Sequence, residues 1–511
     1  MTGHSVEYEV VVVGAGFGGL TMAWELKEAG VQNFLILEEG SEVGGVWREN
    51  TYPGCSCDVP AHLYSLAFDP YRDPRVRYPD AQAILSYLGA VTDRHGLRPH
   101  LRCDTAVVSA DYRDDDRTWS LTTSAGELIR TRAVVWAVGQ LHRPAVAQLR
   151  GADTFGGPMF HSARWDHTAD RTGHIAVVGT GSSAAQMIPE LARTASSVTV
   201  YQRSPSWVLP KPAASFGTMS RWALTHVPGL HGLYRAGLYR AADLVLAPTT
   251  HAGWSARSLE FVAREHLRRQ VRDPELRRKL TPDHRIGEKR ILIDSGYYRA
   301  LTEPHVELVT DSIDRIVPDG IRTVDGIERR ADLIVLATGF RAREFLDGVR
   351  VSGRGGVELH DRWRTEGRPT AFYGLAVPGF PNLYLIAGPH SFTPTNSNPA
   401  VKQHQVRYIM RCLALSARLR EPIEVTDQAM ATYLDHLDDA LDRTVWRDGK
   451  ATTWWKTADG TVTNAWPGTV AAFGKALAGN NPALSFTVPD SPGRLSGGPQ
   501  PRPHDEPCRT G

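Results

Sequence analysis

The feature that most constrains the fold is a glycine-rich segment near the start of the chain, VVVGAGFGGL at residues 11–20. Gly14, Gly16 and Gly19 have the spacing G-x-G-x-x-G, which lets the backbone turn tightly from a strand into a helix and approach a pyrophosphate closely. The β-branched run at residues 10–13 is typical of a strand buried on both faces, and an apolar pattern at helical spacing follows the glycines. The segment therefore predicts a βαβ unit that binds a dinucleotide.

A carboxylate follows at the place where such a unit needs one. A second apolar strand, residues 34–37, ends at Glu38, which lies 24 residues after Gly14. At the end of the second strand a carboxylate can accept hydrogen bonds from the ribose hydroxyls of the nucleotide. The glycine spacing alone is a weak signal, but strand, turn, helix and acid together are a specific one.

A second unit of the same kind begins at residue 175. A strand at 175–178 precedes Gly179 and Gly181, with Ala184 at the third position, where alanine is tolerated. A helix is predicted to about residue 191, and the next strand covers residues 198–201. Two such units imply two separate dinucleotide sites.

The residue that follows the second unit indicates which cofactor binds there. Arg203 stands where a unit that binds NAD carries an acid. A carboxylate would repel the 2′-phosphate of NADPH, whereas a guanidinium binds a phosphate through paired hydrogen bonds. A solvated surface arginine is the alternative interpretation of Arg203. Together with Glu38, the pattern favours FAD at the first site and NADPH at the second.

Short apolar strands alternate with amphipathic helices along the chain, which predicts an α/β fold with parallel sheets. We expect two Rossmann-like dinucleotide-binding domains and a helical insertion whose basic amphipathic helices are solvated rather than bound to a membrane. The expected boundaries are residues 1–150 for the first part of the FAD-binding domain, 151–340 for the NADPH-binding domain with the insertion at about 211–285, 341–490 for the second part of the FAD-binding domain, and 491–511 for a disordered tail with five prolines and four glycines.

The totals exclude several classes of protein. With 58 basic and 56 acidic side chains the formal net charge is +2, which offers no field for binding nucleic acid. No apolar stretch reaches the ~18 residues that cross a bilayer, so we expect no stable membrane insertion, and the N-terminus lacks a signal-peptide pattern. Five cysteines are too few and odd in number for a disulfide framework, which favours a reduced, cytoplasmic protein. We predict no metal site.

A twelve-residue segment before the second unit, FGGPMFHSARWD, matches a long pattern, F-x-G-x-x-x-H-x-x-x-W-[P/D]. This pattern resembles the fingerprint of the type I Baeyer–Villiger monooxygenases. The related flavin-containing and N-hydroxylating monooxygenases usually end the motif without the last two residues. The matching positions are Phe155, Gly157, His161, Trp165 and Asp166.

A second pattern of the same family lies beside the first glycine loop, and the resemblance extends from about Val10 to Trp466. The segment GGVWRENTYPGCSCD at residues 44–58 fits [A/G]-G-x-W, four residues, [F/Y]-P-[G/M], three residues, D. Two long matches in the right order make the resemblance specific. The matching positions are Gly45, Trp47, Tyr52, Pro53, Gly54 and Asp58.

The resemblance implies an NADPH- and O₂-dependent flavoprotein that inserts one oxygen atom next to a ketone carbonyl, by way of a flavin peroxide. It implies that Arg290 lies near the flavin with Asp58 as its carboxylate partner and that Lys289 contacts NADPH. It also implies that Trp47 contributes to cofactor binding and that His161 couples the nicotinamide to domain rotation. The chemistry agrees, because a permanent guanidinium charge stabilises an anionic oxygen at any working pH. An ordinary interdomain ion pair is the alternative for Asp58 and Arg290.

Three other functions stay open at this point. A monooxygenase acting on nitrogen or sulfur would need a protonated flavin hydroperoxide, and the intact Trp165–Asp166 ending speaks against it. A disulfide reductase would use Cys55 and Cys57, although a one-residue gap gives a strained disulfide and packed thiols are favoured. A flavin-binding scaffold without turnover is disfavoured by Lys289 and Arg290. The patterns carry no information on the ketone or on oligomeric state.

Two C-terminal features depart from the family pattern or lack an assigned role. His390 lies in the loop GPHSFTPTNSN, where it is either a substrate contact or, as we favour, a polar loop residue. Four tryptophans fall close together, and packing in the core is the default explanation for each of them. These are Trp446, Trp454, Trp455 and Trp466.

Overall fold

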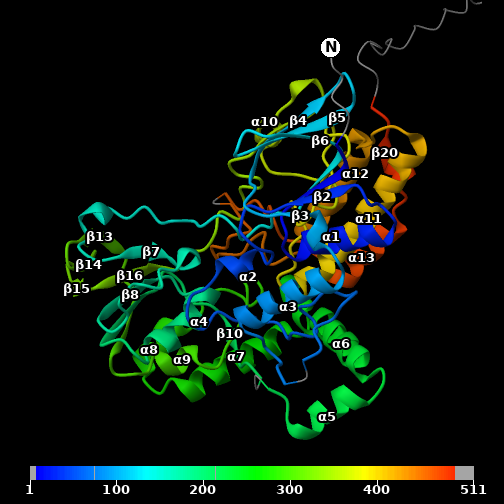
Figure 1. Ribbon diagram of the computed structural model, residues 1–511. Helices are drawn as coiled ribbons and strands as arrows, with labels where there is room; N and C mark the ends of the chain where they lie inside the picture. The colour runs from blue at the N-terminus through cyan, green and yellow to red at the C-terminus, as the bar shows by residue number, and fades with distance from the viewer. Residues whose placement is uncertain (1–6, 74, 213–214, 458, 490–511) are drawn as a thin grey trace, which may run out of the picture.

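The computed structural model describes residues 7–73, 75–212, 215–457 and 459–489 (Figure 1). The disordered tail expected at 491–511 lies outside the described residues. Two main sheets form the framework, and we name the two halves of the molecule the first-sheet domain and the second-sheet domain. Figure 1 shows these halves side by side, with the short helix α2 (Val46–Glu49) between them.

The first sheet has eight strands. Its parallel part has the order β3-β2-β1-β6-β18, and an arm β6-β5-β4-β17 continues from the first half of β6. Helices α1 (Phe17–Glu28) and α11 (Asn398–Leu419) pack together at this domain. The strands are β1 (Tyr8–Val13), β2 (Phe34–Leu37), β3 (Leu101–Arg102), β4 (Val107–Arg113), β5 (Thr118–Thr123), β6 (Leu128–Trp136), β17 (Arg350–Ser352) and β18 (Leu383–Leu385).

The second sheet has five strands, all parallel, in the order β12-β9-β8-β16-β7. Helices α4 (Ser182–Leu191) and α9 (Tyr297–Ala300) pack together beside it, and a small antiparallel sheet adjoins it. The strands of the second sheet are β7 (Met159–His161), β8 (His174–Val178), β9 (Ser197–Tyr201), β12 (Val306–Val309) and β16 (Leu333–Leu336), and those of the small sheet are β13 (Ile313–Val317), β14 (Gly320–Thr323) and β15 (Glu328–Arg330).

The chain crosses between the two domains twice, because strands from both its early and its late part build the first sheet. Between β10 (Val208–Leu209) and β11 (Leu292–Ile293) it forms a run of helices, of which α5 and α6 lie at the lower right of Figure 1 and α7 and α8 pack against the second-sheet domain. These helices are α5 (Thr218–His226), α6 (Leu230–Ala241), the π-helix η4 (Ala242–Leu246), η5 (Ala247–His251), α7 (Ala256–Gln270) and α8 (Pro274–Leu280).

Further α-helices and two short strands complete the first-sheet domain. They are α3 (Ala81–Arg94), α10 (Leu359–Thr365), β19 (Glu424–Val425), α12 (Asp427–Leu441), α13 (Val470–Gly479), α14 (Pro482–Ser485) and β20 (Phe486–Thr487). Among the residues that the structure describes, none of the helices combines the length and apolar character that crossing a membrane requires.

Both predicted βαβ units form, and the packing explains their composition. Side chains of β1 alternate between two apolar clusters, with Val10 and Val12 on one face of the sheet and Val11 and Val13 on the other. In β8, Ile175 and Val177 likewise face a different cluster from Ala176. A strand covered on both faces must be apolar throughout, which is why these runs are continuous. The two nucleotide loops therefore start at the carboxyl ends of central parallel strands.

Candidate active site

The first glycine loop is shaped by close backbone contacts. Gly14 has φ +103°, and a Cβ there would lie 2.7 Å from the carbonyl oxygen of Ala137. A Cβ on Gly19 would collide with the carbonyl oxygen of Gly14. Gly16 faces Gly45, whose Cα would be 3.8 Å from a Cβ on Gly16, so no side chain fills the space at the start of α1. This cradle fits a pyrophosphate at the helix N-terminus.

Glu38 is buried at the end of β2, directly beneath this loop. Its Oε2 accepts a hydrogen bond from the backbone N–H of Ala15 at 2.7 Å. Its Oε1 accepts from the N–H of Gly40 at 2.9 Å and from Nη1 of Arg48 at 2.8 Å. The carboxylate is therefore held in one position, and its remaining lone pairs suit the ribose hydroxyls of a bound dinucleotide.

The second loop repeats the geometry of the first. Gly179 has φ +115°, and a Cβ there would collide with the carbonyl oxygen of Ala337, just after β16. Gly181 has open space where a side chain would begin, at the start of α4. Gly339, φ +86°, turns the chain two residues beyond Ala337 and so lies beside this loop. The counterpart at the first loop is the segment 134–139, which repeats the apolar run and glycine of 334–339.

Two cations converge beside the second loop. Arg203 is exposed just past β9, and Nζ of the partly buried Lys289 donates to Oγ of Ser204 at 3.2 Å. Burial and the nearby charge of Arg203 lower the pKa of Lys289 to about 8. In the part of the chain that the structure describes, neither cation has a carboxylate within ion-pair distance. This geometry fits a 2′-phosphate.

The linker that carries the first family pattern forms β7, the edge strand of the second sheet, paired with β16. The strand ends at His161, whose Nδ1 accepts a hydrogen bond from the N–H of Ala163 at 3.1 Å. Its Nε2 is buried without a partner among the described residues, and burial lowers the pKa of the ring. The imidazole is therefore neutral at physiological pH, with its proton on Nε2.

The end of the same pattern separates into a buried and an exposed part. Trp165 is buried in the core of the second-sheet domain, with its ring edge-on to Phe160 at 5.2 Å. Asp166 is partly exposed and accepts hydrogen bonds from the N–H and the hydroxyl of Thr168 at 2.8 and 2.6 Å. The tryptophan thus fixes the linker to its domain, and the aspartate stabilises the turn that follows.

The second family pattern packs against α4 of the other domain. The hydroxyl of Tyr52 donates to Oε1 of Gln186 at 3.0 Å, and Nε2 of Gln186 donates to the carbonyl oxygen of Ser56 at 2.8 Å. A Cβ on Gly54 would lie 2.5 Å from the carbonyl oxygen of Gln186, so the backbones approach too closely for a larger residue. The tyrosine and glycine of the pattern therefore have a structural role at the domain interface.

Asp58 and Arg290 meet across this interface. Nη2 of Arg290 donates to Oδ1 and Oδ2 of Asp58 at 2.9 and 3.0 Å, and Nε lies 3.3 Å from Oδ2. The side chain of Arg290 is 25% exposed and that of Asp58 is 17% exposed. Burial disfavours the charge, but the carboxylate outweighs it and raises the pKa of Arg290. A permanent, partly accessible cation is therefore held at the junction of both domains.

Trp47 and the two cysteines lie near this pair. Trp47 packs against the cores of both domains, and its Nε1 donates to the hydroxyl of Tyr64 at 3.3 Å. Cys55 and Cys57 are buried free thiols. Burial raises the pKa of Cys55 to about 11 and raises that of Cys57 as well. Thiolates, which thiol–disulfide chemistry requires, are disfavoured here.

The C-terminal aromatic residues approach the same place. Cζ of Arg290 lies 6.0 Å from the ring of Phe392, which contacts Trp454 at 4.5 Å and Trp455 at 6.0 Å between ring centroids. His390, with φ +54°, is fully buried, and burial lowers its pKa to about 3. The ring of His390 is therefore a neutral core group rather than a solvated loop side chain.

Sequence reasoning missed one buried acid beside Lys289 and Arg290. Glu288 accepts hydrogen bonds from the backbone N–H groups of Arg285 at 3.2 Å and Ala451 at 3.1 Å. Next to it, the carbonyl oxygen of Gly287 accepts from Nε1 of the buried Trp446 at 2.9 Å. Residues 446–466 hold the four C-terminal tryptophans and are named the tryptophan-rich segment. These contacts attach it to the segment that carries Arg290. The sequence offers one signal for this role, an acidic residue directly before the basic residues Lys289 and Arg290.

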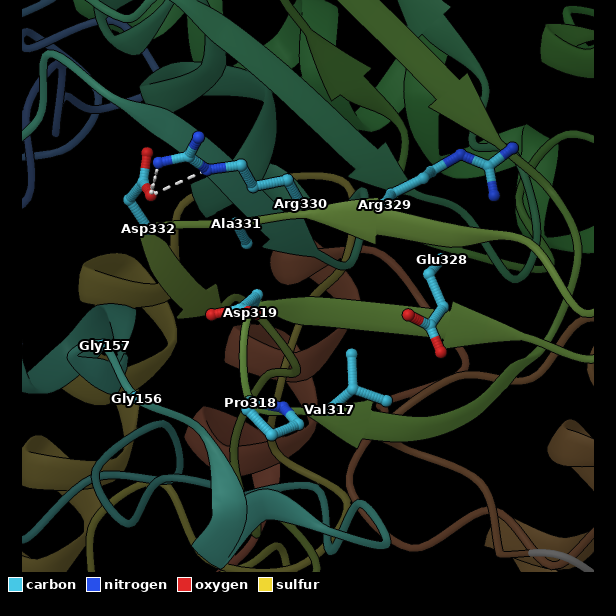
Figure 2. A pocket seen from close by; sticks show the side chains of 10 residues that line it. All are labelled: Gly156, Gly157, Val317, Pro318, Asp319, Glu328, Arg329, Arg330, Ala331 and Asp332. Atoms are coloured by element: carbon cyan, nitrogen blue, oxygen red, sulfur yellow. Dashed lines mark hydrogen bonds and ion pairs between the residues drawn. The ribbon is translucent and has the colours of Figure 1, made fainter.

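A pocket of about 680 Å³ lies elsewhere, between the start of the linker and the small sheet (Figure 2). Figure 2 shows Gly156 and Gly157 on one side and Asp319, Glu328 and Arg330 around the rest. The pocket adjoins Asp332, just before β16 begins, so it lies at the amino edge of the second sheet. The nucleotide loops lie at the opposite, carboxyl edge, and the pocket is separate from them.

Comparisons with known proteins agree with this geometry. A family described as pyridine nucleotide-disulphide oxidoreductase matches residues 11–222. The FAD-binding monooxygenase ktnD of Aspergillus niger is 38% identical over 491 residues, covering 91% of this chain and 79% of that protein. A Baeyer-Villiger monooxygenase of Streptomyces coelicolor is 36% identical over 467 residues, covering 91% of this chain and 89% of that protein.

A solved structure has the same fold over nearly the whole chain. Cyclohexanone monooxygenase from Rhodococcus sp. Phi1, bound to NADP⁺, superposes with a TM-score of 0.83 at 27% identity, covering 95% of this chain and 99% of that one. The resemblance inferred from the two sequence patterns is thereby confirmed, as are the α/β fold and the two Rossmann-type domains. The chain belongs to the family of FAD-dependent Baeyer–Villiger monooxygenases.

Proposed function

We propose that this protein oxidises a ketone to an ester or lactone, with NADPH as electron donor and O₂ as the source of the inserted oxygen. The overall reaction consumes one ketone, one O₂, one NADPH and one proton, and yields the ester, NADP⁺ and water. The relatives named Baeyer-Villiger monooxygenase support this reaction class. The observation that carries the proposal is the Asp58–Arg290 pair at the domain junction.

The first-sheet domain would hold FAD. Gly14, Gly16 and Gly19 leave room for the pyrophosphate at the N-terminus of α1, and Glu38 would accept hydrogen bonds from the ribose. Trp47 lies beside Tyr64 between the two cores, where it would border the cofactor. When bound, FAD takes two electrons from NADPH and passes them to O₂.

The second-sheet domain would hold NADPH. Gly179 and Gly181 form the pyrophosphate loop, and Arg203 and Lys289 would bind the 2′-phosphate. His161, at the end of β7, presents a neutral ring whose Nε2–H is a buried donor without a partner among the described residues. We assign it to positioning the nicotinamide half during domain movement rather than to proton transfer.

Arg290 is the catalytic residue in this proposal. Oxygen insertion places negative charge on an oxygen that attacks the carbonyl carbon and then on the former carbonyl oxygen, and a fixed guanidinium stabilises both charges. Asp58 orients the guanidinium by accepting two hydrogen bonds from it. Because Nε and Nη2 of Arg290 serve the carboxylate, the N–H groups of Nη1 remain for the substrate side.

The test is oxygen transfer from ¹⁸O₂. The holoenzyme is supplied with NADPH, ¹⁸O₂ and a panel of cyclic and linear ketones, together with a sulfide and a tertiary amine. One ¹⁸O atom in an ester or lactone supports the proposal. Labelled sulfoxide or N-oxide with unlabelled, unchanged ketones would establish the heteroatom reaction instead. R290A, tested beside the wild type, should form ester at least about 10²-fold more slowly while it still oxidises NADPH.

A further inference from the structure

A row of four charged side chains runs from the first nucleotide site to the interdomain linker. Oε1 of Glu38 pairs with Nη1 of Arg48 at 2.8 Å, and Nη2 of Arg48 pairs with Oε1 of Glu49 at 2.6 Å. Oε2 of Glu49 then pairs with Nη1 of Arg164 at 2.9 Å. Acid and base alternate along this row, so each charge is held by its neighbours. We name these residues the ribose–linker row.

Arg48 is the central and most constrained member of the row. Its side chain is 16% exposed, and that of Glu38 is 7% exposed. Its Nη1 also donates to the carbonyl oxygen of Glu42, and a Cβ on Gly40 would collide with its guanidinium. Burial disfavours the charge, but Glu49 and Glu38 outweigh it and raise the pKa of Arg48. The side chain therefore has one position, fixed by contacts on several sides.

The far end of the row lies inside the linker. Arg164 ends the 3₁₀ turn Ser162–Arg164, and the ring of His161 caps this turn by accepting from the N–H of Ala163. Trp165, the next residue, is buried in the second-sheet domain. A displacement of Arg164 therefore moves the turn that holds His161. A second contact across the junction, His167 to the hydroxyl of Thr51 at 2.9 Å, lies beside the row.

The row is a property of this chain rather than of the family patterns. Positions 48 and 49 fall in the unspecified part of the pattern that contains Trp47, and position 164 falls in the unspecified part of the linker pattern. Those patterns therefore do not require charges at any of the three positions. Here all three are charged, with signs that pair, and the first of them binds the acid that ends β2.

We propose that Arg48 is a positioning residue that couples occupancy of the FAD ribose site at Glu38 to the conformation of the linker at Arg164. Ribose hydroxyls would add hydrogen bonds to the Glu38 carboxylate, which already pairs with Arg48, and so reinforce the row that continues through Glu49 to the linker arginine. Coupling is reciprocal: to the extent that bound FAD stabilises this conformation of the linker, breaking the row at the linker end weakens FAD binding. The inference rests on the proposed assignment of FAD to the first-sheet domain, but not on the substrate or on the oxygenation step.

The experiment measures FAD release from the holoenzyme, followed by flavin fluorescence after dilution into FAD-free buffer. Arg164 is half-exposed and belongs to the linker, yet R164A should speed FAD release about two- to fivefold, the range expected for a partly solvated ion pair. R48A should speed it by about tenfold or more, because it leaves the buried Glu38 without its cation. The control is R193A, which breaks the exposed Arg193–Glu190 pair of the second-sheet domain. It should release FAD at the wild-type rate.

The double variant separates coupling from general destabilisation. R48A/R164A should release FAD at the same rate as R48A alone, because removing Arg48 already disconnects the linker from Glu38. Release rates that multiply in the double variant, or a wild-type rate in R164A, would overturn the proposal. If R48A does not fold, E49Q replaces it in the same set of variants. This substitution removes the negative charge between Arg48 and Arg164 and keeps the size of the side chain. If the wild-type protein oxidised no ketone but the variants gave the release rates expected above, the proposed function would be contradicted and this inference would stand.

Discussion

Asp58 and Arg290, 232 residues apart in the chain, form a two-point ion pair at the junction of the two domains, with N–O distances of 2.9 and 3.0 Å. The carboxylate comes from the loop that packs against α4, and the guanidinium from the segment that leads into β11. Each domain thus supplies one partner. In this orientation of the domains, the pair holds the guanidinium at the junction between them.

Replacing Arg290 should separate NADPH oxidation from oxygen insertion. In R290A the nucleotide loops are unchanged, so NADPH is still consumed, but the charge that stabilises the anionic oxygen is gone. Removing one such stabilising group costs about 10²–10³ in rate. We expect ester formation to fall by at least that factor, with NADPH oxidation yielding hydrogen peroxide instead. The ratio of peroxide to ester, measured per NADPH consumed, checks this, and an unchanged ratio would contradict the assigned role.

Arg203 should determine the preference for NADPH over NADH. Hydrogen bonds to charged groups contribute about 1.5–3 kcal/mol, and an exposed arginine lies at the low end of that range. R203A should therefore raise KM for NADPH about tenfold and leave KM for NADH unchanged. Steady-state kinetics with both cofactors test this. Equal losses with NADH and NADPH would mean that Arg203 acts on something other than the 2′-phosphate.

Lys289 predicts how cofactor affinity depends on pH. Its pKa is lowered to about 8 by burial and by Arg203, so the ammonium is charged below that value and loses its proton above it. KM for NADPH should therefore be flat below pH 8 and rise about three- to tenfold by pH 9, because only the ammonium attracts the phosphate. K289M should raise KM at neutral pH and remove the rise. A wild-type profile that stays flat through pH 9 would contradict the placement of Lys289.

The nucleotide loops could be predicted from the sequence because their requirements are local. Gly14 and Gly179 occupy backbone conformations that favour glycine, and the strands before them are buried on both faces, so composition and conformation are tied together. The meeting of Asp58 with Arg290 followed only from resemblance, since no local rule joins residues so distant in the chain. Its geometry agrees with what the resemblance implied, while its catalytic role stays a proposal.

Other parts of the site could not be predicted, for physical reasons. Arg48, Glu49 and Arg164 resemble solvated surface charges, and only the fold shows that they pair. The linker strand β7 has three residues and depends on β16 for its hydrogen bonds, so it leaves no periodic signal. The ring of His390 is buried, although its polar surroundings in sequence favoured an exposed loop.

The cysteines provide a test against disulfide reductase chemistry. Cys55 and Cys57 are buried and free, and the pKa of Cys55 is raised to about 11, so almost no thiolate forms at neutral pH. C55S and C57S should keep NADPH oxidation and ester formation within about twofold of the wild type, with a small loss of stability from burying a hydroxyl. Turnover assays of each variant check this. Loss of flavin reoxidation in either one would revive the reductase interpretation.

Glu288 should hold the tryptophan-rich segment against the segment that carries Arg290. Its two oxygens accept separate backbone hydrogen bonds, from Arg285 and from Ala451, and E288A leaves both donors without that acceptor at a cost of about 1–3 kcal/mol. Hydrogen exchange in residues 445–456 should become faster, and kcat for ester formation should fall more than the rate of NADPH oxidation, because Arg290 lies two residues from Glu288. E288Q keeps one acceptor oxygen and should show a smaller change in both measurements. Unchanged exchange in E288A together with a lowered kcat would mean that Glu288 affects Arg290 directly, without the segment.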